Sequence, residues 1–242
     1  MSGHSKWSKI KNKKGKEDQK RGAIFTKATR AINLAARQGG GNIDMNFSLR
    51  LAVEKAKSLN MPKDNIERAI KKGAGETGGV DLEEILYEGF GVGGIAIMIE
   101  TLSDNRNRTG SEVKNTLTKN GGSLGAPGSV KWQFERKGVV RLVNEKKDIT
   151  GDWESLQLAL MDAGAEDIRE ADEGVEIISA TEDFKNLLEF LKKSEIETDD
   201  SGLEWVAREP LSLSEEASIK LEKLVEKIED CDDVQDVFTN QK

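Results

Sequence analysis

Lysine and arginine side chains are concentrated at the start of the chain, where their number and spacing suit binding to phosphate groups. Residues 1–72 hold 18 Lys and Arg against 6 Asp and Glu, a net charge of +12, whereas residues 73–242 carry −19. Clustered cations bind dense phosphates well because binding releases condensed counterions. The sequence therefore predicts nucleic acid as the partner of this end. The residues expected to meet phosphates are Lys6, Lys9, Lys11, Lys13, Lys14, Lys16, Lys20, Arg21, Lys27 and Arg30.

Three more side chains extend this predicted interface. Trp7 lies among the lysines, and an exposed indole can stack on a nucleic-acid base. The alternative is that Trp7 anchors the arm on the helical domain. Arg106 and Arg108 lie at the expected start of a helix, whose positive end suits phosphate. The alternative there is helix capping by Asp104 or Asn105 with ordinary surface charge.

Two glycine-rich patterns resemble catalytic or cofactor motifs, and both lack the required context. Residues 89–94 match the dinucleotide-binding G-x-G-x-x-G, but an expected strand follows them where that motif needs a helix. Residues 121–125 match the G-x-S-x-G of hydrolases, but the only histidine is His4, on the arm. With Cys231 as the only cysteine, no metal site built on Cys and His is possible. The sequence predicts a protein that is not an enzyme and has no cofactor.

Composition predicts a globular protein of two or three domains. Charged residues make up 33% of the 242 residues and hydrophobic residues 36%. The basic start is not followed by the apolar run of a signal peptide, and no apolar stretch is long enough to span a bilayer. A single cysteine fits a reducing compartment. We expect a cytoplasmic protein with no membrane partner, and a monomer as the default.

The first third of the chain is expected to form a flexible basic arm, residues 1–20, and a helical bundle, residues 21–76. Apolar residues recur at helical spacing in three segments, and glycines follow the first and the third. The helices are expected at about 17–38, 46–59 and 62–73.

Beyond residue 76 the hydrophobic period changes to two, which indicates strands. Strands are expected at 85–87 and 95–101, a helix at 108–119, and a half-buried strand at 130–135 in which Val130, Trp132 and Phe134 point inward. The next segment follows the βαββαβ order of a ferredoxin-like module. Its elements are expected at 139–143, 152–163, 166–171, 175–180, 183–193 and 203–208.

A last helix, 214–229, and strand, 234–238, are expected to return to the middle domain and complete it. The predicted fold class is α+β, a three-helix domain followed by two α+β, ferredoxin-like domains, the last inserted in the middle one. The middle domain would comprise residues 77–137 plus 209–242, and the inserted domain residues 138–208.

Several longer motifs occur together in this chain. They are Gly3-His4-Ser5-Lys6-Trp7, Lys20-Arg21-Gly22, Phe25-Thr26-Lys27, Gly39-Gly40-Gly41, Asn60-Met61-Pro62, Tyr87-Glu88-Gly89-Phe90-Gly91, the segment from Leu102 to Thr109, and Gly128-Ser129-Val130. In this set and order the chain resembles the YebC/PmpR family, which includes the mitochondrial translational activator of cytochrome oxidase. The resemblance implies three domains and a cytoplasmic, non-enzymatic regulator of gene expression.

Two activities go with that family, and the residues leave both open. One is DNA binding as a transcriptional regulator, and the other is ribosome-associated assistance to translation, notably at proline-rich stretches. No helix-turn-helix pair and no RNP1 aromatic signature stands out, and a basic arm suits the irregular grooves of ribosomal RNA. A protein–protein adaptor that uses the acidic surface of residues 138–242 is the alternative from another class.

Overall fold

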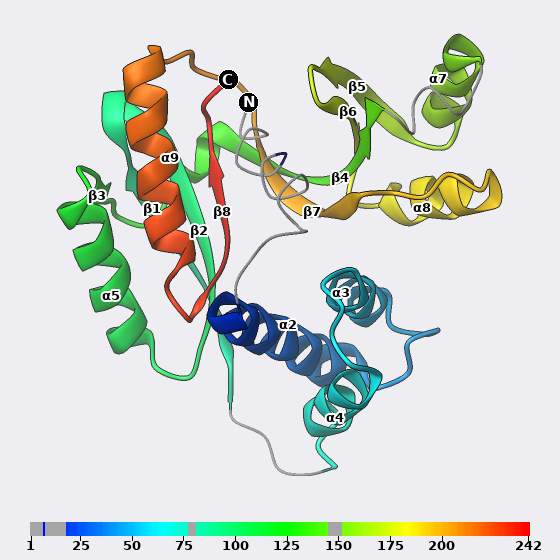
Figure 1. Ribbon diagram of the computed structural model, residues 1–242, viewed down its shortest axis with the longest axis horizontal. Coiled ribbons are helices and arrows are strands. Elements are labelled where there is room, and N and C mark those ends of the chain that lie inside the picture. Colours follow the sequence, from blue (N-terminus) through cyan, green and yellow to red (C-terminus); the bar gives the residue numbers. More distant parts are fainter. Residues whose placement is uncertain (1–6, 8–17, 77–80, 145–151) are drawn as a thin grey trace. The chain divides into compact units, whose positions relative to one another are not determined.

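The computed structural model describes residues 7, 18–76, 81–144 and 152–242 (Figure 1). The chain divides into two compact units, one made of residues 1–135 and 207–242 and the other of residues 136–206. The predicted flexible arm lies outside the described residues, apart from Trp7 and the residues from Asp18 onward. Within the described part of the chain, none of the helices has the length and hydrophobicity needed to cross a bilayer.

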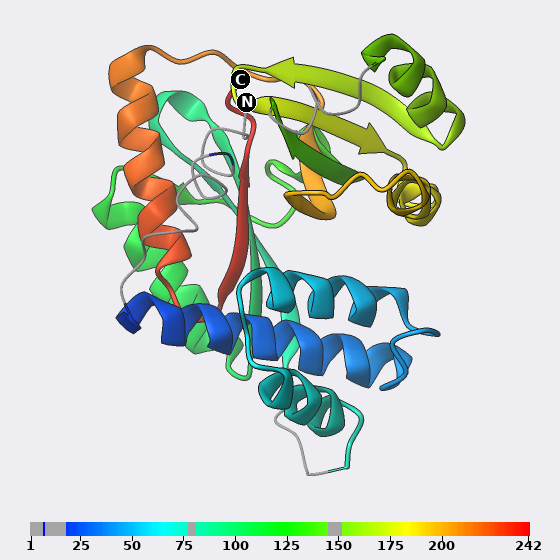
Figure 2. The ribbon, with the colours of Figure 1, turned by 45° about the vertical axis from the view of Figure 1, so that its right-hand side comes forward.

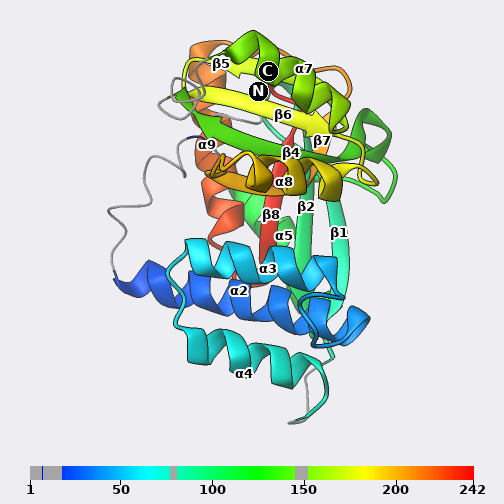
Figure 3. The ribbon, with the colours of Figure 1, turned by 90° about the vertical axis from the view of Figure 1, so that its right-hand side faces the viewer.

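The helical domain consists of α2 (Asp18–Gly39), α3 (Phe47–Ser58) and α4 (Lys63–Gly73), which lie side by side (Figure 3). Their apolar faces form a separate core around Ile32, Leu49 and Val53. The turn from α2 to α3 is fixed by one buried side chain, Asn46. Its Oδ1 accepts the N–H of Leu49 at 3.0 Å, which caps α3, and its Nδ2 donates to two carbonyl oxygens at the end of α2.

The middle domain is an antiparallel sheet in the order β3-β1-β2-β8 with two helices on one face (Figure 1). Its core joins Ile97 and Ile99 to Leu117 and Leu224. The glycine-rich segment 89–94 forms the end of β1 and the turn of a hairpin, because β2 pairs antiparallel with β1 directly after it. The elements are β1 (Glu83–Phe90), β2 (Ala96–Ser103), α5 (Arg106–Lys119), β3 (Ser123–Leu124), α9 (Glu215–Glu229) and β8 (Val234–Thr239).

The last helix and strand belong to this middle domain. Strand β8 pairs with β2, and α9 covers the same apolar core as α5. This confirms the predicted α+β fold class with the last domain inserted in the middle one. The two sheet domains differ in how their strands are connected. In the middle domain, the two central strands of the sheet, β1 and β2, are consecutive in the sequence.

The inserted domain has the predicted βαββαβ order and a sheet in the order β5-β6-β4-β7 (Figure 2). Strand β6 is buried along its whole length, and Phe184, Leu187 and Leu191 of α8 are buried as the predicted apolar stripe. The elements are β4 (Phe134–Val143), α7 (Trp153–Asp162), β5 (Ala165–Ala171), β6 (Gly174–Ser179), α8 (Phe184–Lys193) and β7 (Asp200–Ala207).

The inserted domain contains a buried ionic cluster around Arg141, whose side chain is 2% exposed. Two nitrogens of its guanidinium group bind the two carboxylate oxygens of Glu204 at 2.7 and 2.9 Å. Glu176 on the neighbouring strand accepts from Nε at 2.8 Å, and Asp200 lies at 3.2 Å. Burial alone would lower the pKa of Arg141, but these three carboxylates raise it above its ordinary value. The cation is therefore held charged in the interior.

The predicted strand at 130–135 is wrong in its first half. Lys131–Gln133 form a 3-10 helix, η3, and β4 begins only at Phe134. The cause is Glu88, a buried residue of β1 whose carboxylate accepts the backbone N–H groups of Gly128, Val130 and Lys131 at 2.6, 2.7 and 2.8 Å. These three backbone N–H groups can reach one carboxylate only if the backbone turns, so this part of the chain cannot be an extended strand.

The stability of the protein is expected to depend on the ionisation of Glu88. Burial raises the pKa of Glu88, but the three N–H donors and the nearby Lys131 outweigh burial and lower it below its ordinary value of 4.5. A carboxyl group with a lowered folded-state pKa stabilises the fold above its unfolded-state pKa. That contribution is lost as the pH falls through the folded-state value.

Glu88→Gln is therefore expected to lower the free energy of unfolding at neutral pH by about 1–3 kcal/mol, because an amide has one acceptor oxygen for these donors. The gap between the native protein and the variant should close as the pH falls below 4.5. Urea titrations over a pH series measure this gap, and a gap that does not change with pH would contradict the assignment.

Candidate nucleic-acid interface

Most of the predicted phosphate-binding residues lie on the arm, outside the described residues: Lys6, Lys9, Lys11, Lys13, Lys14 and Lys16. Lys20 and Arg21 belong to the first turn of α2, and their side chains are not among those described. Their charge is counted from the sequence alone, so the binding of phosphate by these residues remains a prediction.

Trp7 is the one arm residue with a described side chain, and it is 1% exposed. A ring in that position has no face open to a nucleic-acid base, so the expectation of an exposed stacking Trp7 is corrected. Its indole nitrogen is buried and has no hydrogen-bond partner among the described residues. The described core of the helical domain does not include Trp7, so the alternative in which Trp7 anchors the arm on that domain stays a prediction.

Lys27 and Arg30 of α2 are half-buried and reach residues 229–233, between α9 and β8. The ammonium group of Lys27 donates to the carbonyl oxygen of Glu229 at the end of α9. Arg30 donates to the carbonyl oxygen of Asp232 at 2.7 Å and to Oδ1 of Asp233 at 2.8 Å. These two cations attach the helical domain to the middle domain, which corrects their assignment as open phosphate contacts.

Asp233 is the centre of this attachment. Its side chain is 3% exposed, and its second oxygen accepts the hydroxyl groups of Ser103 and Thr109 at 3.0 and 2.6 Å and the guanidinium of Arg108 at 2.8 Å. Burial raises the pKa of Asp233, but these donors and the charge of Arg30 lower it overall. We call Asp233 and its four donors the Asp233 hub.

The hub also corrects the assignment of Arg106 and Arg108. Arg108 bridges Asp233 and Asp104, and Asn105 caps α5 by accepting the N–H of Arg108 at 3.1 Å. Arg106 pairs with Glu83 at 3.4 Å. The alternative of capping plus paired surface charge therefore describes this segment, although both arginines keep more than half of their side-chain surface exposed.

Three lysines of the helical domain are positively charged and form no ion pair with a carboxylate of the described residues. Lys57 lies in the last turn of α3, and Lys71 and Lys72 lie in the last turn of α4. All three are exposed, and none makes an ion pair with a described residue. Sequence reasoning left them out of the site. The only signal for them was the pair Lys71-Lys72 directly before Gly73.

A cleft of about 510 Å³ lies between α2, α4 and the start of β1. Arg30, Arg37 and Lys72 line it, together with Asp81 and Asp104. Arg37 pairs with Asp81 at 2.7 Å. Of these three cations, Lys72 is the one that makes no ion pair with a described residue, so we count it with the exposed lysines of the helical domain.

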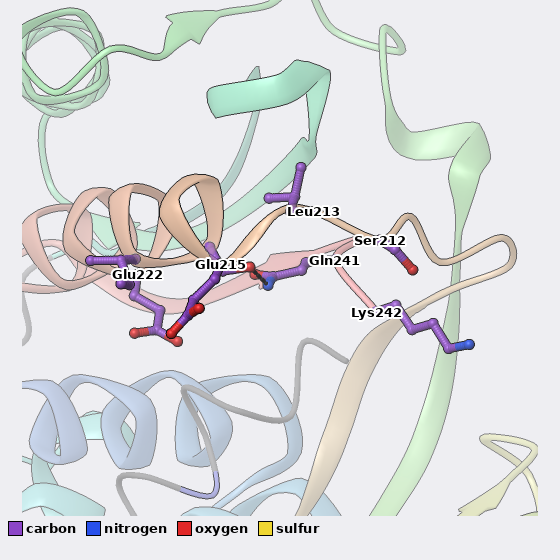
Figure 4. Close-up of a pocket in the computed structure, with 8 residues that line it drawn as sticks. Ser212, Leu213, Glu215, Glu222, Gln241 and Lys242 are labelled. Atoms are coloured by element: carbon purple, nitrogen blue, oxygen red, sulfur yellow. Dashed lines mark hydrogen bonds between the residues drawn. The ribbon is translucent and has the colours of Figure 1, made fainter.

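A second groove, of about 540 Å³, runs along the start of α9 and the end of the chain (Figure 4). Glu215 and Glu222 line it with Lys242, and the Gln241 amide that lies across it donates to Ser218 at 2.8 Å. Two carboxylates against one ammonium group do not suit a phosphate. Within the described ranges, no three acidic, His or Cys side chains are placed to hold a metal ion.

Comparison with known proteins places the whole chain in one family. Residues 5–76 match the model of the TACO1/YebC protein N-terminal domain, and residues 82–241 match that of the TACO1/YebC second and third domain. The chain belongs to the TACO1/YebC family. The resemblance stated from the sequence motifs is confirmed.

TACO1/YebC relatives match the chain over nearly its full length. A protein of Borrelia duttonii is 49% identical over 99% of this chain and 97% of its own, and one of Natranaerobius thermophilus is 45% identical over 99% and 96%. Both are named probable transcriptional regulatory protein. The crystal structure of a conserved hypothetical protein from Aquifex aeolicus superposes with a TM-score of 0.83, at 40% identity, over 95% of this chain and 94% of its own.

Proposed function

We propose that the protein is a nucleic-acid-binding regulator of gene expression whose basic helical domain and N-terminal segment contact phosphates. The observation that carries this proposal is the charge of +12 in residues 1–72 together with the exposed Lys57, Lys71 and Lys72. The name of its relatives, probable transcriptional regulatory protein, supports the regulatory role.

The proposed contact set differs from the one that the sequence alone suggests. Lys27, Arg30, Arg106 and Arg108 are held by partners inside the molecule, so the main contacts pass to the arm and to the three exposed lysines. The exposed part of Arg106 and Arg108 stays open to nucleic acid. The arm and the first turn of α2 contribute Lys6, Lys9, Lys11, Lys13, Lys14, Lys16, Lys20 and Arg21.

Neutralising three lysines tests the ordered part of this surface. The variant with Lys57→Gln, Lys71→Gln and Lys72→Gln is expected to bind RNA and DNA roughly tenfold more weakly at moderate salt, with a salt slope lower by about two. The matched control replaces Lys192, Lys193 and Lys223, which are also exposed and without an ion pair to a described residue. Filter binding over a salt series measures both variants. Equal loss in both would contradict a localised surface.

The choice between transcription and translation needs a second experiment. Ribosome co-sedimentation and promoter-DNA binding are measured on the native protein and on a variant with Gln in place of the six arm lysines from Lys6 to Lys16. Ribosome association that the variant loses supports a translation factor. Sequence-specific DNA binding without ribosome association supports a transcription factor. Negligible binding to both nucleic acids would favour the protein–protein adaptor.

A further inference from the structure

Trp132 is the most exposed aromatic side chain in the described part of the chain. It keeps 71% of its surface open, although it lies between Val130 and Phe134, which are both buried. A large indole left in water forgoes the stabilisation that burial would give it. The other strongly exposed large apolar side chains of the described residues are aliphatic or Met: Met45, Leu158, Met161, Leu211 and Ile219.

The backbone around Trp132 is held rigidly. Glu88 binds the N–H groups before it, as described above, and Gly125 donates to the carbonyl oxygen of Glu88 at 2.8 Å. On the other side of Trp132, the side-chain oxygen of Gln133 accepts a hydrogen bond from the Asn240 amide at 2.9 Å. The backbone carbonyl oxygen of Gln133 accepts the N–H of Arg208 at 2.9 Å. The exposed ring therefore stands on a segment that is fixed at both ends.

The ring itself is oriented by its own hydrogen bond. The indole Nε1–H donates to the carbonyl oxygen of Ser129 at 3.1 Å. This bond uses the only polar group of the side chain and leaves the aromatic surface as the part that can bind a ligand. An oriented ring also loses little conformational entropy on binding.

We propose that Trp132 is a stacking platform for an unpaired nucleic-acid base, a contact that deepens the proposed nucleic-acid-binding function and rests on it. Stacking on an aromatic face does not depend on base identity, because every base has a π surface. Lys131, next to the ring in the sequence, brings one cation to this segment, and the Glu88 carboxylate bound to its backbone N–H brings one anion, so the stacking surface and not local charge would supply the contact.

A proline-rich peptide is another ligand that exposed aromatic residues bind. Such peptides dock in grooves lined by several aromatic side chains. Among the described residues no second strongly exposed aromatic side chain accompanies Trp132, and its N–H is already bound to Ser129. These observations favour a base.

The test compares Trp132→Ala and Trp132→Phe in the full chain, with Leu158→Ala as the matched control for loss of an exposed apolar side chain. The probes are a short single-stranded RNA and the same RNA with abasic sites. Trp132→Ala is expected to bind the intact RNA roughly 5- to 100-fold more weakly, with an unchanged salt slope, while Phe restores most of the affinity. On the abasic RNA the native protein and Trp132→Ala should bind equally.

Two results would overturn the platform. If Trp132→Ala binds the intact RNA like the native protein while the triple lysine variant binds weakly, the platform is refuted and the proposed function stands. If Trp132→Ala loses binding only to a proline-rich peptide probe, the ring serves a peptide. If the native protein binds neither RNA nor DNA, the proposed function itself fails, and this result differs from both of the others.

Discussion

Replacing Arg141 with alanine is expected to lower the free energy of unfolding of the inserted domain by about 3–5 kcal/mol, because buried carboxylates are left without their counterion. Glu204 and Glu176 are nearly as buried as Arg141 itself, at 7% and 10% side-chain exposure. Without the guanidinium group, these acids must take up protons or open the sheet to water. Either response costs stability at neutral pH.

The measurement is urea-induced unfolding followed by circular dichroism, with Arg169→Ala as the control. Arg169 lies on β5 of the same sheet and pairs with Asp167 at 2.7 Å, but both side chains are more than 40% exposed. Exposed pairs of this kind contribute about 0–1 kcal/mol. The Arg141 variant should recover part of its loss at acid pH, where the carboxyl groups bind protons. Equal destabilisation of the two variants would contradict the assignment.

Asp233→Ala is expected to lower the free energy of unfolding by about 2–4 kcal/mol and to loosen the helical domain, because one carboxylate satisfies donors from two domains. The hydroxyl groups of Ser103 and Thr109 are both 1% exposed and lose their charged acceptor. Arg30 loses its bond from α2 to the turn that precedes β8. Asp233→Asn, which keeps an acceptor but not the charge, should be intermediate.

Two readouts separate these effects. Urea unfolding gives the overall loss, and hydrogen exchange reports on α2, whose amide protons should exchange faster in Asp233→Ala than in the native protein. Asp230→Ala serves as the control because Asp230 is 49% exposed and pairs only at 3.4 Å with Lys227. Unchanged exchange in α2 together with a stability equal to that of the control would refute the role of the hub.

Periodicity predicted the elements of this protein well because most helices and strands have one buried face. The stripe of Phe184, Leu187 and Leu191 and the fully buried β6 are examples. The insertion was also predictable, since a surplus helix and strand remained at the end of the chain. The error at Trp132 has a physical cause: the bonds that turn this segment come from Glu88, 44 positions earlier, and no local pattern contains that contact.

The candidate site was less predictable than the fold. Charge counts located the basic third, but they could not show that Lys27, Arg30 and Arg108 bind acceptors more than 100 positions away. Two of the longer motifs prove to join distant parts of the molecule. One carries Glu88 for the 128–131 turn, and the other carries Ser103, Arg108 and Thr109 for the hub. In the sequence alone, motifs of this kind resemble binding sites, because the distant residues that they contact can be identified only in the structure.

The pairing of β8 with β2 has a consequence for the order in which the protein folds during synthesis. Strand β2 leaves the ribosome more than 100 residues before its partner β8, so its edge and the surface that α9 covers stay open meanwhile. In the sequence, the inserted domain lies between β2 and β8, so it can form its own sheet before β8 is synthesised. A nascent chain interrupted before residue 207 therefore exposes the edge of an apolar strand that is paired on one side only, a ready site for aggregation and for capture by chaperones.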